Sequence, residues 1–278
     1  MKTIVSHLGP DIDSITATWL IKKFLPGWQN AVLKFVPAGS TLDKKPADEN
    51  PDIIHVDTGF GKFDHHQTKK NTCASLLVYQ FLKSKKFIKK KHEKPLKRLV
   101  DQVNNFDHFG EINFNDPAAD HYEFLINNII DSGLKSVIKN DQDIMFLVFP
   151  LLDGLFHTFT KKINAEKEMK KGIIFQSRWG KSIAINSKNE EVIKLALKKG
   201  FQLAVRKDPQ TGHIRIKTQP KKNLNLRPLY LKIIKIDKKG SWFLHASGNM
   251  LLNGSSKNPH LIASQLTLKQ IIDIIKNV

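Results

Sequence analysis

Residues 2–24 read KTIVSHLGPDIDSITATWLIKKF, and this stretch decides the fold. Residues 2–6 have the pattern of a short buried strand, and the polar loop from His7 to Ser14 follows them. After the loop, apolar residues recur with the spacing of one helical face, at Ala17, Leu20, Ile21 and Phe24. The beginning of the chain therefore predicts a strand, a loop and a helix.

The same alternation continues along the first half of the chain. Short apolar runs at residues 32–36 and 53–56 predict further strands, and the apolar spacing within residues 74–81 predicts a helix. Residues 95–159 have a mostly helical pattern. This order predicts an α/β fold, a parallel sheet with helices on both faces, in a first domain of residues 1–160.

A smaller second domain is expected after a polar linker at residues 161–172. Residues 173–278 contain strand patterns at 182–185, 202–205, 213–217 and 242–245, and a helical pattern at 192–196. A last helix is expected from Thr267, with Gln270 completing a capping box. This mixture predicts a C-terminal α+β domain.

The composition is that of a soluble globular protein. Of 278 residues, 40% are hydrophobic and 26% are charged, and no stretch approaches the roughly 18 apolar residues of a membrane span. We therefore expect no membrane association, and the first residues lack the pattern of a secretory signal. The single cysteine, Cys73, excludes an internal disulfide and a site built from several thiolates. A reducing cytoplasm fits these features.

The formal net charge of +19 would attract polyanions, and nucleic acid is the commonest partner of such a surface. Nine of the basic residues lie between Lys83 and Arg98. The alternative, a solvated lysine-rich surface, is equally compatible with this run. RNA or single-stranded DNA is therefore the expected partner, and the role of the lysine run stays open.

The loop at the end of the first strand concentrates charged ligands. His7, Asp11 and Asp13 stand within seven residues, and carboxylates so close repel one another unless a cation lies between them. Oxygen ligands with one imidazole suit Mn²⁺ or Mg²⁺. A simple helix cap at Asp13 or Ser14 is the alternative, and for Ser14 alone it is the favoured one.

Two further motifs follow in the same region. Asp57 comes directly after the apolar run 53–56, so we expect it at the end of a strand, beside the first loop. The triplet Asp64-His65-His66 follows after a glycine-containing turn. These histidines could reach one metal and one substrate phosphate; surface histidines in a loop are the alternative.

The order HxxxDxD, strand-end Asp, then Asp-His-His resembles the DHH phosphoesterase superfamily over residues 1–110. That superfamily includes exonucleases, oligoribonucleases and family II pyrophosphatases. The segments Asp57-Thr58-Gly59 and Phe63–Gln67, with Trp242–Gly248, look closest to the melanocyte-proliferating-gene family of metal-dependent exonucleases. This second resemblance extends over most of the chain.

The resemblance implies two divalent cations, with Mn²⁺ in first place and Mg²⁺ as the alternative. One cation would be held by His7, Asp11 and Asp57, and the second by Asp13, Asp57, His65 and a later carboxylate. For the later carboxylate, Asp107 is the candidate and Asp101 the alternative. His66 would face the substrate phosphate and Asp64 would orient a histidine, so Asp57, Asp64 and His66 are the expected catalytic residues.

The resemblance also assigns substrate binding to the C-terminal domain. Plausible phosphate or sugar contacts in the C-terminal domain are Arg206, Arg215, His245, Ser247 and Gly248. From the first domain, His66 is expected to contact the substrate as well. Satisfied or solvated side chains are the equal alternative for the two arginines and His245. Leu251-Leu252 stands where the closer family has a Gly-Gly pair, and this puts backbone contacts to a phosphate there in doubt.

Three hypotheses follow for the function. The first is a Mn²⁺-dependent 3′-to-5′ exonuclease or oligonucleotide phosphodiesterase, in which two cations activate a water molecule. The second is a small-molecule phosphatase, acting on pyrophosphate or on cyclic or short nucleotides, which a lysine cluster far from the metals would favour. The third is a nucleic-acid-binding protein without catalysis.

Overall fold

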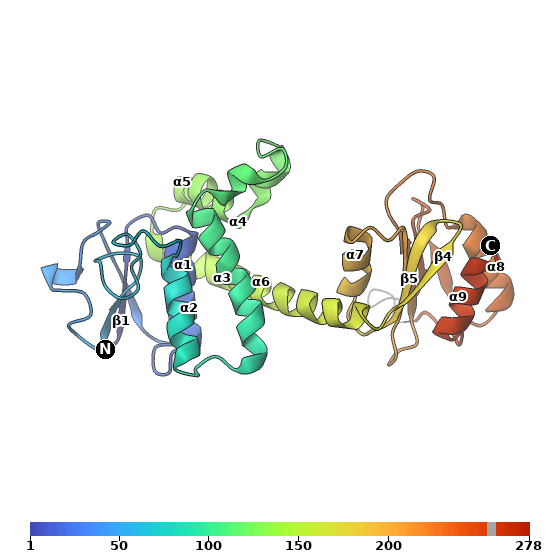
Figure 1. Ribbon diagram of the computed structural model, residues 1–278, viewed down its shortest axis with the longest axis horizontal. Coiled ribbons are helices and arrows are strands. Elements are labelled where there is room, and N and C mark those ends of the chain that lie inside the picture. The colour runs from blue at the N-terminus through green and yellow to red at the C-terminus, as the bar shows by residue number, and fades with distance from the viewer. Residues whose placement is uncertain (255–259) are drawn as a thin grey trace. The chain divides into compact units, whose positions relative to one another are not determined.

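A computed structural model describes residues 1–254 and 260–278 of the chain (Figure 1). The chain divides into two compact units, residues 1–160 and 161–278. Helix α6, Asp141–Met169, begins in the first unit and ends in the second, so residues 161–169 of the expected linker are helical.

The first unit is built on a three-stranded parallel sheet in the order β2-β1-β3. The strands are β1 (Thr3–His7), β2 (Val32–Val36) and β3 (Ile53–His55). Thr3 is paired with Val32 on one side and with Ile53 on the other, so the three strands run in register and end at the same edge. The metal-ligand motifs follow β1 and β3 at that edge.

Three long helices accompany the sheet: α1 (Ile12–Phe24), α2 (Ala74–Ser84) and α3 (Lys90–Asp107). Helix α1 is buried almost along its whole length, and it packs together with α2, α3 and α6 in one apolar core. Shorter elements connect α3 to α6. They are η2 (Gly110–Asn113), η3 (Asp120–Phe124), α4 (Ile126–Asn128), the π-helix η4 (Ile129–Leu134) and α5 (Lys135–Val137); η1 (Leu42–Lys44) lies between β2 and β3.

The second unit contains a six-stranded mixed sheet in the order β4-β5-β6-β7-β9-β8. The strands are β4 (Ile173–Ser177), β5 (Gly180–Asn186), β6 (Leu203–Lys207), β7 (Ile214–Thr218), β8 (Trp242–Leu244) and β9 (Met250–Asn253). Its helices are α7 (Glu191–Lys198), α8 (Arg227–Ile236) and α9 (Leu268–Lys276). Among the described strands of this second unit, only the pair β5–β6 is parallel, and two apolar clusters form the core of the unit.

The structure confirms the expected fold class, a parallel α/β unit followed by an α+β unit. The capping box at the start of α9 is also confirmed, because Thr267 Oγ1 accepts a hydrogen bond from Gln270 N. Elements β4, α8 and β9 were not predicted.

One expectation about apolar stretches needs correction. Among the described residues, α6 is long and apolar enough to cross a membrane, with a mean hydropathy of 1.3 over its most apolar 18-residue window. A single such helix is weak evidence, because core helices of soluble proteins have similar length and composition.

Candidate metal centre

The loop after β1 places His7 and Asp11 on one side of the site. Asp11 is the N-cap of α1: its Oδ1 accepts a hydrogen bond from Ser14 N at 2.9 Å, and Ser14 Oγ accepts one from Asp11 N at 3.1 Å. Ser14 is therefore part of a capping box, while the cap itself is Asp11. The second oxygen of Asp11, Oδ2, lies 3.8 Å from His7 Nε2 and remains available to a cation.

Asp13 lies one residue into α1 and is fully buried. Its two carboxylate oxygens accept hydrogen bonds from Ala74 N at 2.6 Å and Ser75 N at 2.9 Å. These are the first amides of α2, which the helix itself leaves without partners. Asp13 thereby fixes the N-terminus of α2 against α1, in addition to any role as a ligand.

Asp57 occupies the centre of the site. It follows β3 in a left-handed backbone conformation, with φ of 57°, and its side chain is 2% exposed. Asp57 Oδ2 lies 3.3 Å from His7 Nε2, and Oδ1 lies 3.2 Å from His65 Nε2. One carboxylate thus faces both the first loop and the Asp-His-His triplet.

Within the triplet, Asp64 holds its neighbour His66 in place. Asp64 Oδ1 accepts hydrogen bonds from His66 Nδ1 at 2.7 Å and from His66 N at 3.1 Å, while Oδ2 accepts one from Phe60 N at 2.7 Å. The carboxylate of Asp64 is buried, whereas the ring of His66 is 57% exposed. His66 is therefore oriented by a buried acid and faces solvent.

The last carboxylate at the site comes from the end of α3. Asp107 Oδ2 lies 3.7 Å from His65 Nε2. Asp101, the alternative from the sequence, lies six residues earlier on α3, about 1.7 turns away, and forms an ion pair with Lys97 at the surface. The structure thus brings Asp107, and not Asp101, to the cluster.

Burial and crowding perturb the proton equilibria of this cluster. Burial, together with the charges of Asp57, Asp11 and Asp107, raises the pKa of Asp13 to about 8. Burial also raises the pKa of Asp107 to about 6, although His65 opposes the shift.

For His7, His65 and Asp11, the neighbouring groups favour the charged form of the side chain. Burial disfavours the protonated form of His7, but the nearby carboxylates of Asp11 and Asp57 outweigh it and raise the pKa of His7 to about 11. The nearby carboxylate of Asp57 raises the pKa of His65 to about 9, against the effect of burial. For Asp11, the effect of burial is outweighed by the nearby imidazole of His7, which lowers the pKa of Asp11 to about 2. Protons held on histidine thus offset the carboxylate charges, a role that a cation can also fill.

The donor atoms form groups that could hold metal ions. Ligand atoms of His7, Asp11 and Asp57 lie within 4.8 Å of one another, and so do those of Asp13, His65 and Asp107. A third group at the same spacing, Asp57, His65 and His66, connects the first two groups. Carboxylate oxygens with an imidazole are suitable ligands for Mn²⁺ or Mg²⁺.

Unsatisfied buried atoms point to the same position. Asp57 Oδ1, His65 Nε2 and Asp107 Oδ2 are buried and have no hydrogen-bond partner among the described residues. Buried polar atoms are normally paired, because an unpaired one costs about 1–3 kcal/mol. Three such atoms on neighbouring side chains, two of them oxygens of acids, are what a cation would satisfy.

Two residues at the site were not predicted from the sequence. His108 Nδ1 lies 3.4 Å from Asp107 Oδ2 and donates a hydrogen bond to Asn104 O at 2.8 Å. Asp141, the first residue of α6, accepts a hydrogen bond from Gly9 N at 3.1 Å and so contacts the first loop. The position of His108 next to Asp107 could have suggested it, whereas Asp141 is 132 residues away from Gly9.

The arginines predicted to bind substrate are engaged inside the second unit. Arg206 is 3% exposed, and its Nη1 donates hydrogen bonds to Ser187 O at 3.1 Å and to Lys188 O at 3.3 Å. Arg215 forms an ion pair with Glu190 at 2.5 Å. Both guanidinium groups therefore already have partners within their own unit.

The other residues predicted in the second unit form a turn between β8 and β9. His245 Nδ1 accepts a hydrogen bond from Ser247 N at 3.2 Å and lies 3.0 Å from Ser247 Oγ, and Gly248 has a φ of 72°. Leu251 is fully buried in β9, where it pairs with Ile216 of β7. The backbone at Leu251 is thus part of the sheet.

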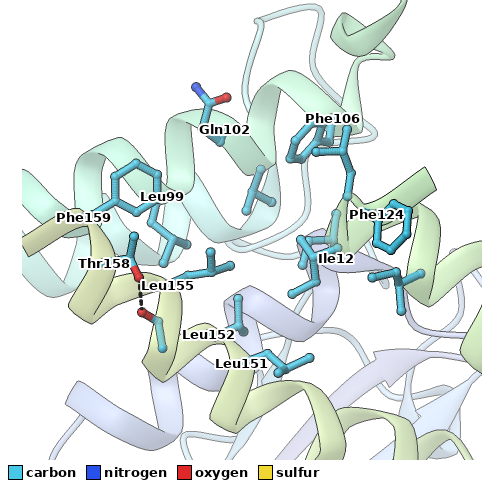
Figure 2. Close-up of a pocket in the computed structure, with 15 residues that line it drawn as sticks. Ile12, Leu99, Gln102, Phe106, Phe124, Leu151, Leu152, Leu155, Thr158 and Phe159 are labelled. Carbon is cyan, nitrogen blue, oxygen red and sulfur yellow. Dashed lines mark hydrogen bonds between the residues drawn. The ribbon is translucent and has the colours of Figure 1, made fainter. Parts of the chain in front are cut away.

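An apolar cavity of about 550 Å³ lies beside the metal centre in the first unit (Figure 2). Figure 2 shows Ile12 of α1 between Phe106 of α3 and Leu152 of α6. Ile12 stands between Asp11 and Asp13 in the sequence, and Phe106 precedes Asp107. Thr158, at the wall, donates its hydroxyl to Gly154 O. This cavity has little to bind a phosphate, which leaves the polar cluster as the candidate site.

No family model matches the chain, and no curated protein matches it. Among solved structures, the chain is similar to a protein described as a DHH-domain member of the s1p family of ribosomal proteins. The identity is 10% and the TM-score 0.33, over 99% of this chain and 86% of the other.

Proposed function

We propose that this chain is a phosphoesterase of the DHH type, which binds two divalent cations and hydrolyses phosphoester bonds. The observation that carries the proposal is the position of Asp57, whose two oxygens face His7 and His65 and connect the two ligand groups. A carboxylate in this position suits a bridging ligand. The order of the motifs, which resembles that superfamily, supports the same conclusion.

The residues of the chain divide the chemical tasks among them. His7, Asp11 and Asp57 would hold one cation, and Asp13, Asp57, His65 and Asp107 the other. Two bound cations would lower the pKa of a water molecule and neutralise charge on the phosphate oxygens. Asp64 orients His66, whose exposed ring can donate a hydrogen bond to a phosphate oxygen. No nucleophile from the protein is required, and Ser14 is occupied in its capping box.

The substrate class we favour is a single-stranded oligonucleotide, RNA or DNA, cleaved as by a 3′-to-5′ exonuclease. The net charge of +19 supports a polyanionic substrate. Mn²⁺ is the expected cation, and the cytoplasm the expected location, since Cys73 is a free, buried thiol.

A small phosphoester, such as pyrophosphate or a short nucleotide, is a second candidate, and the position of the lysine run favours it. Asp13 binds the first amides of α2, whereas Lys83, the first lysine of the run, lies near the other end of this helix, about 14 Å away. The partners of Arg206 and Arg215 also favour the small substrate, because each guanidinium already forms a hydrogen bond or an ion pair within its own unit.

Hydrolysis assays on the full chain test the proposal. Purified protein with Mn²⁺ is incubated with 5′-labelled single-stranded RNA, with the p-nitrophenyl ester of thymidine 5′-monophosphate, and with pyrophosphate. We expect cleavage by the wild type, a loss of at least about a hundredfold in Asp57→Asn, and no loss in the matched control Asp101→Asn. Activity that survives Asp57→Asn would refute the two-cation mechanism. Cleavage of pyrophosphate alone would refute the oligonucleotide reading and favour the second candidate.

A further inference from the structure

The second ligand group, which consists of Asp13, His65 and Asp107, depends on the ends of two helices. Asp107 is the last residue of α3, and Asp13 binds the first amides of α2. A helix end frays more easily than the middle of a helix, because its last carbonyl groups have no partners within the helix. The contacts that fix the end of α3 therefore decide whether Asp107 stays within reach of a cation.

The end of α3 lacks the usual glycine. His108 is the C-cap, and Phe109 after it adopts a left-handed backbone conformation with φ of 53°. Glycine is the common residue in this position, because a side chain makes the left-handed region unfavourable. Phe109 is also 73% exposed, so burial of its ring does not offset the unfavourable backbone. Another contact should therefore hold the chain where α3 ends.

The side chain of His108 supplies this contact. Its Nδ1 lies 2.8 Å from Asn104 O, one of the last carbonyl groups of α3. A carbonyl oxygen can only accept a hydrogen bond, so Nδ1 carries the hydrogen. The same Nδ1–H group lies 3.4 Å from Asp107 Oδ2. The carboxylate thus lies beside an N–H group, while its Oδ2 has no hydrogen-bond partner among the described residues that would compete with a cation.

Further contacts join the end of α3 to the rest of the second ligand group. Asn104 Nδ2 donates a hydrogen bond to Asn71 Oδ1 at 2.6 Å, and Asn71 lies three residues before Ala74, the first residue of α2. The ring of His108 lies beside that of His65, with 6.3 Å between the ring centroids. Asn104 and His108 therefore connect the end of α3 with the start of α2 and with the Asp-His-His triplet.

We infer that His108 is a positioning residue of the metal centre, which holds Asp107 in the orientation of a ligand for the cation of the second ligand group. This inference rests on the proposed function and adds a residue that the ligand motifs do not contain. Loss of a neighbouring group that orients a ligand commonly weakens metal binding by about 10- to 100-fold. His108 should affect one cation and not the other, because the group of the other cation contains no residue of α3.

Binding of Mn²⁺ to the full chain, measured by equilibrium dialysis and by titration with electron paramagnetic resonance, tests the inference. His108→Leu removes the Nδ1–H group, so it should bind one Mn²⁺ as the wild type does and the other about 10- to 100-fold more weakly. His108→Asn, whose amide can donate from a similar position, should restore most of the affinity. The matched control is His157→Leu, because His157 is an exposed histidine of α6 in the same unit; this variant should bind both ions as the wild type does.

A double variant separates positioning from a general effect on the fold. In Asp107→Asn, the ligand that His108 positions is already lost, so adding His108→Leu should weaken Mn²⁺ binding no further. A residue that only stabilises the fold would weaken Mn²⁺ binding equally in both backgrounds, and this result would overturn the inference. Unchanged Mn²⁺ affinity in His108→Leu would overturn it too, and so would an equal loss in His108→Asn or in His157→Leu.

Hydrolysis assays separate this inference from the proposed function. If the wild type binds two Mn²⁺ ions but cleaves no substrate, the proposed function fails while the titration still decides the role of His108. A wild type that binds no Mn²⁺ would overturn both. In an active enzyme, the kcat lost in His108→Leu should return at high Mn²⁺ concentration. A KM for the thymidine p-nitrophenyl ester that stays raised at saturating Mn²⁺ would indicate contact with the substrate and overturn the positioning role.

Discussion

Replacing Asp57 with asparagine should remove both cations, because Asp57 is the residue that connects the two ligand groups. The substitution keeps the shape of the side chain and one oxygen, but it removes the charge between His7 Nε2 at 3.3 Å and His65 Nε2 at 3.2 Å. By contrast, Asp107→Asn changes only the group that contains Asp13 and His65. The structure therefore predicts a graded loss of metal.

The size of the stabilisation follows from the binding of the cation to the folded state alone. A cation present at one hundred times its dissociation constant stabilises the folded state by about 2.7 kcal/mol per site. For a domain of this size, 1 kcal/mol corresponds to about 2–4 °C in Tm. Each occupied site should thus raise the Tm of the first unit by about 5–11 °C. The wild type, with two sites, should show twice this shift in Tm. Asp107→Asn, which keeps one site, should show half of the wild-type shift, and Asp57→Asn almost none.

Thermal unfolding with and without Mn²⁺ measures these shifts, and metal analysis after equilibrium dialysis counts the bound ions. Asp101→Asn is the control, because Asp101 is on the same helix as Asp107 but pairs with Lys97 at the surface. Two bound Mn²⁺ ions in Asp57→Asn would refute the shared position of Asp57. Equal losses in Asp101→Asn and Asp107→Asn would refute the choice of Asp107.

Three further outcomes are expected from urea unfolding. Leu152→Ala, at a fully buried position of α6, should cost about 2–5 kcal/mol; a loss below 1 kcal/mol would contradict its place in the core. Burial lowers the pKa of His55, so the unfolded state takes up more protons at acidic pH, and the free energy of unfolding should fall as the pH drops through about 6.5. His55→Gln should lose this part of the pH dependence of stability, and an unchanged pH profile in the variant would contradict the prediction. Arg206→Met should destabilise the second unit, because its partners Ser187 O and Lys188 O lose their donor; unchanged stability with a raised KM would instead support a role in substrate binding.

The centre of the candidate site could be predicted from local sequence. The carboxyl ends of parallel strands share one edge of a sheet, so the residues after β1 and β3 had to be neighbours once both strands were recognised. His7 and Asp57 follow from this rule alone. Asp64 and His66 are two residues apart, and their contact is equally local.

The remaining parts depend on tertiary packing that no local pattern contains. Asp101 and Asp107 are both on α3, and the choice between them depends on where that helix ends relative to His65. The bond from Gly9 to Asp141 joins residues 132 positions apart. Helix α8 was missed because its apolar run, LYLKIIKI, is compatible with a strand or a helix at this length.

The position of the ligands also explains why cations should stabilise the whole first unit. Asp11 caps α1, Asp13 binds the amides of α2, and Asp107 ends α3, while Asp57 and His65 belong to the loop after β3. Bringing these acids together without a cation costs electrostatic repulsion, which the histidine protons offset only in part. A cation removes this cost and at the same time ties the ends of three helices to the edge of the sheet. Metal binding should therefore raise the global unfolding temperature and not only order a loop.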